Sequence, residues 1–316
     1  MNDINRTYFK LRLSTVFALM LGIMSSEVAC ADDEGRLLAT GGVTQIEGSA
    51  GGGITPWALI AGYETQDQIG GTAFLTNVSV PNYHLVSGGA AVGFYNRVEL
   101  SVAQQQLSLG NQVLNAFSPT LSPAIRQDVF GVKVRVLGDA IFDQDSWVPQ
   151  VAVGLQYKHN LDEGFVPKTL GAISDSGTDF YVSATKVILG GLMGHNVLLD
   201  GNIRETKANQ MGLLGFGGPT KNNYSTEFEG SVGVFLDAAN QWLVGAEYRQ
   251  NPDNGLFPGS AYKQSAYKDA YISYIPNKRF ALVVAYADLG NLPNTTMSGL
   301  NQSSSDGMYV SGQFCF

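Results

Sequence analysis

The sequence is short of the residues that would support disulfides or catalysis. It has two cysteines, Cys30 and Cys315, and we expect Cys30 to be removed with a leader segment, which leaves no pair for an intrachain disulfide. Its three histidines, His84, His159 and His195, lie far apart, and none has a Glu partner at metal-ligand spacing. No serine sits in a hydrolase motif, and no phosphate-binding loop is present. We therefore expect no enzyme, no metal site and no cofactor.

A long apolar run is also missing. The main apolar run, Leu13–Met24, has 12 residues, whereas a membrane-spanning helix needs about 20. Basic residues precede it and the small residues Ala29 to Ala31 follow it, which is the arrangement of a secretory signal peptide. We therefore predict a signal peptide at residues 1–31 and a single mature domain at residues 32–316, which is exported to the cell envelope.

Basic residues are in the minority. The chain has 19 Lys and Arg against 27 Asp and Glu, with a formal net charge of −8. An acidic chain is a poor match for nucleic acid, so we expect no nucleic-acid partner. Hydrophobic residues make up 44% of the chain. A lipid-facing barrel would differ from a soluble β protein in how these residues alternate along strands.

That alternation is clearest at the C-terminus. In Ser305–Phe316, apolar side chains fall on alternate positions that include Met308, Val310, Phe314 and Phe316. A period of two is typical of a strand with unlike environments on its two faces. A terminal strand that ends in an aromatic residue resembles the closing strand of a Gram-negative outer-membrane β-barrel. This resemblance implies that Phe314 and Phe316 form the signal read by the barrel-assembly machinery.

The rest of the chain supplies candidate neighbours for this strand. Short and long connections alternate along most of it, as in outer-membrane barrels. We predict an all-β protein, a single closed antiparallel transmembrane β-barrel of about fourteen strands. The predicted strands are Gly41–Glu47, Trp57–Glu64, Gly71–Val78, Tyr83–Phe94, Arg97–Leu107, Gln127–Leu137, Trp147–Lys158, Thr178–Leu189, His195–Glu205, Tyr224–Leu236, Gln241–Arg249, Lys268–Ile275, Arg279–Asp288 and Ser305–Phe316.

Two segments fit this pattern less well. Gly41–Val78 is rich in glycine and has short links, so a barrel of twelve strands with an N-terminal segment folded inside or beneath it is the alternative. Met211–Gly218 is unusually apolar for a loop and is a candidate for folding into the barrel mouth.

Aromatic residues gather at the ends of the apolar strand faces. Because amphipathic rings prefer the headgroup level, two belts at the two membrane interfaces are expected. The belt candidates are Trp147, Trp242 and Phe280 where strands begin, and Tyr157, Tyr248 and Tyr286 where strands end.

The opposite strand faces carry charges that would point into the lumen. The short turn between Tyr224–Leu236 and Gln241–Arg249 allows two registers, and repulsion between like charges favours the one that sets Glu229 opposite Arg249. The lumen-lining candidates are Lys133, Arg135, Lys158, Asp200, Arg204, Glu227, Glu229, Glu247 and Arg249.

Fourteen strands would leave an open lumen, so a porin-like passive channel for small solutes is the leading prediction. A structural or interaction barrel with an occluded lumen is the alternative. An uptake channel for hydrophobic compounds is a minor alternative, because residues 32–40 are too few for a large plug. The expected partners are small solutes, outer-membrane lipid and lipopolysaccharide, and the barrel-assembly machinery.

Several blocks of sequence go beyond a generic barrel pattern. Together they resemble an uncharacterised family of proteobacterial outer-membrane proteins, described only as a domain of unknown function, and the resemblance spans nearly the whole mature chain. It implies a barrel in the outer membrane of a Gram-negative bacterium and no particular site. The blocks are TGGVTQIEGSAGGGITPWALIAGY (40–63), RQDVFGVKVRV (126–136), SDSGTDFY (174–181), TKANQMGLLGFGG (206–218) and PNKRFALVVAYADLG (276–290).

Overall fold

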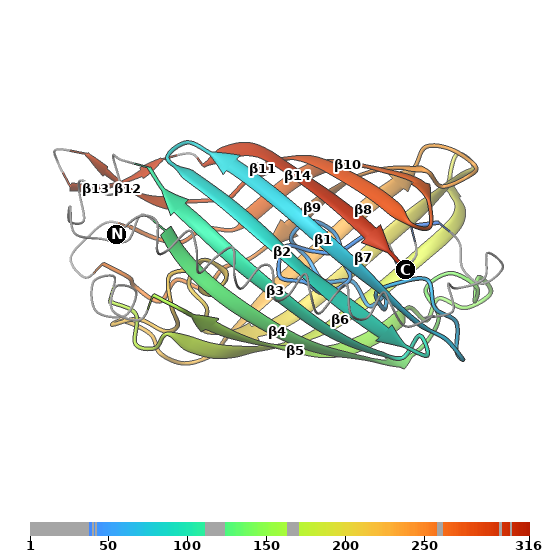
Figure 1. The fold of residues 1–316 in the computed structure, drawn as a ribbon, viewed down its shortest axis with the longest axis horizontal. Helices are drawn as coiled ribbons and strands as arrows, with labels where there is room; N and C mark the ends of the chain where they lie inside the picture. The colour runs from blue at the N-terminus through green and yellow to red at the C-terminus, as the bar shows by residue number, and fades with distance from the viewer. Residues whose placement is uncertain are drawn as a thin grey trace.

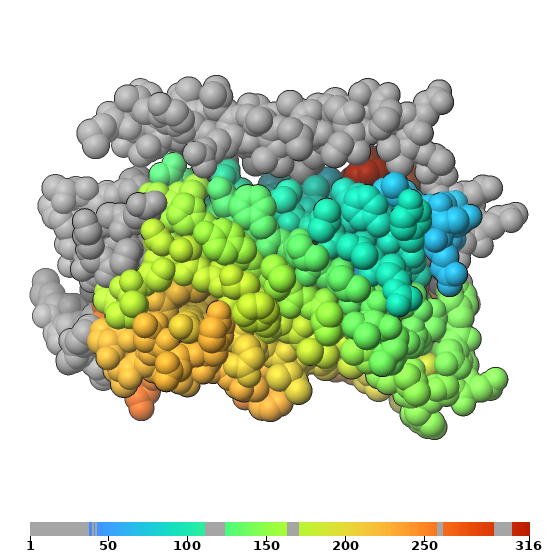
Figure 2. All heavy atoms as spheres, turned by 90° about the horizontal axis from the view of Figure 1, so that it is seen from below, coloured from blue at the N-terminus to red at the C-terminus, as the bar shows by residue number. Residues whose placement is uncertain are grey.

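The chain folds into a closed antiparallel β-barrel (Figure 1). The computed structural model describes residues 38–39, 41, 43–110, 124–162, 171–257, 262–296, 299–303 and 305–316. The barrel strands are β1 (Ile69–Val80), β2 (Tyr83–Phe94), β3 (Val98–Leu109), β4 (Ala124–Leu137), β5 (Gln150–Asn160), β6 (Ser176–Leu192), β7 (His195–Thr206), β8 (Ser225–Phe235), β9 (Trp242–Arg249), β10 (Tyr267–Asn277), β11 (Phe280–Asp288) and β14 (Asp306–Cys315). Figure 2 looks onto the outer wall, where the strands lie side by side in chain order, from teal through green and yellow to orange.

The strands form because their side chains alternate between two environments. In β9, Trp242, Val244 and Tyr248 face outward and are exposed, whereas Leu243 and Arg249 face inward and are buried. This is the parity predicted for the strand, and the outer surface is apolar along most of the wall. The only helix among the described residues is the single turn η1 (Gln210–Gly212). No helix in that part of the chain is long and apolar enough to cross a membrane.

The C-terminal strand closes the barrel, as predicted. β14 lies between β1 and β11, and its register sets Thr72 opposite Cys315. Beyond the strand, the Phe316 amide donates to the Gly71 carbonyl at 3.0 Å, and the Gly71 amide donates to the Phe316 carbonyl at 2.9 Å. The last residue is therefore hydrogen-bonded to the start of the first strand.

The barrel has two unlike rims. We call the rim where β1 begins and β14 ends the terminal rim, and the opposite one the loop rim. Most connections at the terminal rim are short, such as Met193-Gly194 between β6 and β7. The loop rim carries the longer connections, although β1 and β2 are joined there by only Pro81 and Asn82. One loop-rim connection contains a separate two-stranded sheet, β12 (Leu292–Thr296) with β13 (Gly299–Ser303), which the sequence pattern did not predict.

The prediction of fourteen strands is wrong, and the alternative of twelve strands is confirmed. Gly41–Glu47 and Trp57–Glu64 are not wall strands. From residue 43 on, both ranges belong to residues 43–64, here called the inner segment, which lie inside the barrel and are almost completely buried. The predicted signal peptide, residues 1–31, lies outside the described residues.

Glycine explains why the inner segment folds inward instead of joining the wall. A Cβ on Gly52 would lie 1.8 Å from Oε1 of Glu247 on β9, and a Cβ on Gly51 would lie 2.2 Å from the Thr55 carbonyl oxygen. Gly48 has a positive φ of 102°, which L side chains rarely adopt. These glycines let the backbone turn tightly and approach the wall, whereas a strand would gain nothing from them.

The closure predicts the effect of two matched glycine substitutions. A Cβ on Gly71 would lie 2.7 Å from the Phe316 ring and 2.8 Å from the Ala91 carbonyl oxygen, whereas a Cβ on Gly201 would meet nothing within 4 Å. We expect Gly71→Val to destabilise the closed barrel by roughly 1–3 kcal/mol through overpacking. Gly201→Val is the control and should leave stability unchanged. Heat-modifiable migration in gels measures the folded fraction, and equal unfolding midpoints for the two variants would contradict this account of closure.

Candidate functional site in the barrel lumen

The lumen contains the inner segment (blue in Figure 1). Its two ends meet near the terminal rim, where the Gly62 amide donates to the Gly41 carbonyl at 2.8 Å and the Ala39 amide donates to the Tyr63 hydroxyl at 3.2 Å. Between these ends the segment runs into the barrel and turns back. Trp57, the largest buried side chain, is 1% exposed. The segment therefore fills the lumen as a plug.

Wall side chains hold the backbone of this plug. A buried segment outside the sheet must still pair its N–H and C=O groups. Glu247 accepts from the amides of Gly53 at 2.6 Å and Ile54 at 2.8 Å. On the other side of the lumen, the Lys133 ammonium donates to the carbonyls of Ala50 at 2.9 Å and Trp57 at 3.0 Å. Polar groups of the wall thus replace the partner strand that the segment lacks.

A closed ring of six alternating charges joins the plug to the wall. Glu47 of the plug pairs with Lys158 on β5 and, at 2.7 Å, with Arg249 on β9. Three wall groups complete the ring: Lys158 to Asp179 at 2.6 Å, Asp179 to Arg204 at 3.5 Å, Arg204 to Glu229 at 2.5 Å and Glu229 to Arg249 at 3.2 Å. All six side chains are buried. Three cations face three anions, so the ring is electrically balanced.

Glu47 is the only member of this ring that belongs to the plug. Burial alone would raise the pKa of its carboxyl, but the facing cations Arg249 and Lys158 hold that pKa well below its ordinary value. Glu47 is therefore charged at neutral pH. Its carboxylate ties the plug to two strands at once, because its two oxygens contact different cations.

The predicted lumen residues divide into two groups. Lys133, Lys158, Arg204, Glu229, Glu247 and Arg249 lie inside the barrel and are buried, and Asp200 is half-buried among Thr185 and Asn202. The register sets Glu229 opposite Arg249, as predicted. The other two candidates stay apart from the plug. Arg135 lies at the terminal rim and pairs with Asp139 at 3.0 Å, and Glu227 is half-buried toward the loop rim.

The sequence reasoning missed two members of the ring. Asp179 has the inward parity of β6 but was hidden among the serines and glycine that precede it. Glu47 was assigned to a strand, and alternation alone gave no sign that it belongs to a plug.

The predicted aromatic belt residues all lie on the outer surface. Trp242 and Phe280 are the first residues of β9 and β11, and Trp242 stacks on Tyr274 with ring centroids 4.3 Å apart. Trp147 does not begin a strand as predicted. It precedes β5 in the β4–β5 connection and is 88% exposed, because the strand starts only at Gln150. Tyr157, Tyr248 and Tyr286 are exposed near the other ends of their strands.

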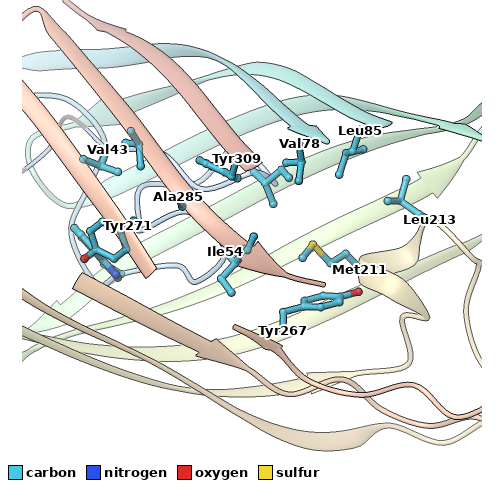
Figure 3. Close-up of a cluster of buried hydrophobic side chains, with 14 of the residues drawn as sticks. Val43, Ile54, Val78, Leu85, Met211, Leu213, Tyr267, Tyr271, Ala285 and Tyr309 are labelled. Atoms are coloured by element: carbon cyan, nitrogen blue, oxygen red, sulfur yellow. The ribbon is translucent and has the colours of Figure 1, made fainter. Parts of the chain in front are cut away.

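An apolar chamber lies between the plug and the loop-rim connections, and Figure 3 shows Ile54, Met211 and Tyr267 around it. Its volume is about 60 Å³. Met211, Leu213 and Leu214 come from the predicted inward loop, which is buried in the barrel mouth. The chamber is lined by Ile46, Ile54, Val78, Tyr83, Leu85, Leu107, Leu109, Ile125, Gln210, Met211, Leu213, Leu214, Phe257, Tyr267, Leu289, Leu292, Pro293 and Tyr309. The lumen is thus polar around the ring and apolar above the plug.

Within the described ranges, no group of three or more His, Cys, Asp or Glu side chains is arranged to hold a metal ion.

The chain was compared with known proteins. A family model described as a protein of unknown function (DUF3034) matches residues 40–313. A search of curated proteins found no match. Among solved structures, the chain is similar to the KdgM porin, at 10% identity and a TM-score of 0.44, over 78% of this chain and 99% of that chain.

It is also similar to the NanC porin, at 8% identity and a TM-score of 0.44, over 77% of this chain and 98% of that one. The outer membrane protein Omp33 of Acinetobacter baumannii matches at 9% identity and a TM-score of 0.43, over 80% of this chain and all of that one. Because these TM-scores are below 0.5, the similarities indicate no function for this chain.

The ring predicts how the plug responds to the loss of one charge. Glu47→Gln leaves Lys158 and Arg249 short of a buried counter-charge, a change that costs about 3 kcal/mol when a buried pair is broken. We expect amide exchange in residues 43–64 to become at least about tenfold faster, measured by hydrogen–deuterium exchange of the folded barrel. The control is Glu205→Gln on β7, a half-buried carboxylate outside the ring. If Glu47→Gln exchanges no faster than this control, the ring does not hold the plug.

Proposed function

The chain belongs to the DUF3034 family, which is described as a protein of unknown function. From its own lumen, we propose that it is a gated outer-membrane transport barrel. In this conformation the plug closes the lumen, and a small solute passes when the plug is displaced. The observation that carries the proposal is the plug itself, residues 43–64, which is fixed to the wall by polar contacts.

Placement in the outer membrane of a Gram-negative bacterium rests on the outer surface. An even number of tilted antiparallel strands, with an apolar outer band between aromatic residues, is the architecture of outer-membrane barrels. The exposed side chains Phe130, Val153, Ile203 and Val232 belong to that band, and Trp242 lies at one end of it. In water these side chains would form a large apolar surface, which soluble monomers avoid.

The chemistry of the wall supports transport over a purely structural role. Buried ion pairs are often no more stabilising than well-packed apolar side chains of similar volume, so a pair between two wall strands, such as Arg204 with Glu229, is not needed merely to hold the plug. Here the wall faces the plug with Lys133, Lys158, Arg204 and Arg249 and with matching carboxylates. Such a wall can exchange its contacts with the plug for contacts with water, which an apolar wall cannot do.

The size of the barrel supports the same reading. About eight strands are just filled by side chains, while 16 to 18 leave a channel. Twelve strands fall between these cases, so the lumen is wide enough to hold a folded segment of chain. Removal of that segment would leave an opening for small solutes.

A structural or interaction barrel with an occluded lumen is the second candidate, and the closed lumen of this structure is the observation that favours it. An uptake channel for hydrophobic compounds ranked third because residues 32–40 are too few for a large plug. The structure removes that objection. The plug comes from residues 43–64 and not from the residues before them.

Single-channel recording in planar bilayers tests the proposal. We expect the intact barrel to be closed most of the time, with rare openings. Deletion of residues 43–64 removes the plug and leaves every wall strand in place, since β1 begins at Ile69. It should raise the mean conductance about tenfold or more, because the lumen then fills with water.

A point variant provides a second test in case the deletion variant does not fold. Glu47→Lys places a fourth cation in the ring beside Lys158 and Arg249 and should raise the open probability in the same direction. Glu205→Lys is the matched control and should behave like the intact barrel. If both plug variants fold, by heat-modifiable migration, and stay closed, the barrel is structural and the proposal fails. A steadily open intact barrel would instead indicate a passive porin.

A further inference from the structure

The apolar chamber is lined almost entirely by hydrocarbon side chains, and neither the plug contacts nor the charge ring requires such a lining. Its floor is formed by Ile46 and Ile54 at the tip of the plug, and its roof by Met211, Leu214 and Phe257 from loop-rim connections. Strands β1 to β4, β10 and β14 supply the side walls. Roughly 10–15 Å³ is enough for one water, and the chamber offers about 60 Å³. An apolar cavity of about 150 Å³ stays dry and binds benzene or xenon, and this chamber has the same kind of lining in a smaller volume.

Most of the polar groups in the chamber wall are already engaged. The Tyr83 hydroxyl donates to the Pro293 carbonyl, and the Tyr267 hydroxyl donates to Oε1 of Gln210. The Gln210 amide nitrogen donates to the Tyr262 hydroxyl and the Asn291 carbonyl, both at 3.0 Å.

The Tyr309 hydroxyl has no hydrogen-bond partner among the described residues, but protein atoms cover it, so this residue presents only its ring to the chamber. The chamber therefore offers a ligand almost no hydrogen-bond donor or acceptor.

We infer that this chamber is a binding site for a small nonpolar molecule without hydrogen-bonding groups, of the size of one aromatic ring or a short alkyl chain. A site of this chemistry gains from burying hydrocarbon, and it rejects a hydroxyl or carboxyl group, which would lose its water and find no partner. Binding itself does not depend on the proposed function. Only the further step, that such molecules are the transported solutes, rests on it.

The roof of the chamber is the part that can adjust to a ligand. Gln210 and Met211 both have positive φ, 47° and 58°, which is uncommon for side chains other than glycine. Met211 is also an adaptable lining side chain, because its unbranched thioether has three rotatable bonds. A ligand larger than the present free volume would therefore enter by shifting this turn, while the strands keep their register.

Toluene and phenol form a matched pair of probes, since they differ by a methyl in place of a hydroxyl. Binding is followed on the folded, full-length barrel through the 13C-labelled methyl groups of methionine. Met211 lines the chamber, whereas Met308 is 49% exposed on the outer face and reports partition into the detergent. We expect toluene to shift the Met211 signal saturably and the Met308 signal only in proportion to concentration. Phenol should bind roughly tenfold or more weakly.

Two variants of the plug complete the test. Ile54→Phe fills the chamber and should weaken toluene binding about tenfold. Leu59→Phe is the control, because Leu59 lies at the other end of the plug beside a pocket of about 10 Å³. It should leave the affinity unchanged. Equal binding of phenol and toluene, no saturable shift at Met211, or equal effects of the two variants would each overturn the inference. None of these results alters the conductance test, so the two proposals can fail separately.

Discussion

The structure depends on one constraint, that a segment of chain inside a barrel must satisfy its backbone without a sheet partner. The wall meets this demand with side chains. Glu247 pairs two consecutive amides, and Lys133 bridges two carbonyls that are seven residues apart in sequence. Lumen-facing charges that would line a channel are instead occupied by the plug. Much of the polar character of the lumen wall follows from the need to hold a peptide there.

The same constraint divides the lumen into two regions. Around the plug, ion pairs and amide contacts fix each group in place, because an unpaired charge in such a setting is costly. Above the plug, where loops enter from the rim, the chain buries leucine, isoleucine and methionine instead. A single barrel thus holds a polar region that grips its own chain and an apolar region that is free to accept a small guest.

The alternation of side chains along strands made the wall predictable from the sequence, but it did not predict the plug. Alternation identified β9 and β14, and repulsion between like charges was enough to pair Glu229 with Arg249 correctly. Trp147 was assigned to a strand because apolar residues also alternate in the connection before β5. Gly41–Glu47 was misread because a glycine-rich run alternates by chance. Its position is fixed by contacts with β5 and β9, which no local pattern contains. Asp179 was missed for a local reason, because serines and a glycine precede it and obscure the alternation of β6.

The contact between the plug and β9 also bears on the order in which the chain folds. The Glu47–Arg249 hydrogen bond spans 202 residues, so it cannot form until the plug and β9 have come together. A peptide gripped from several sides cannot be threaded easily into a finished cylinder. We therefore expect the plug to be seated while the seam between β1 and β14 is still open. Non-local pairing of this kind is slow, because the entropy cost of closing the long loop is met before the contact contributes any stability. Pairing of the last strand, β14, with β1 then encloses the plug, a segment that precedes the first strand in the chain.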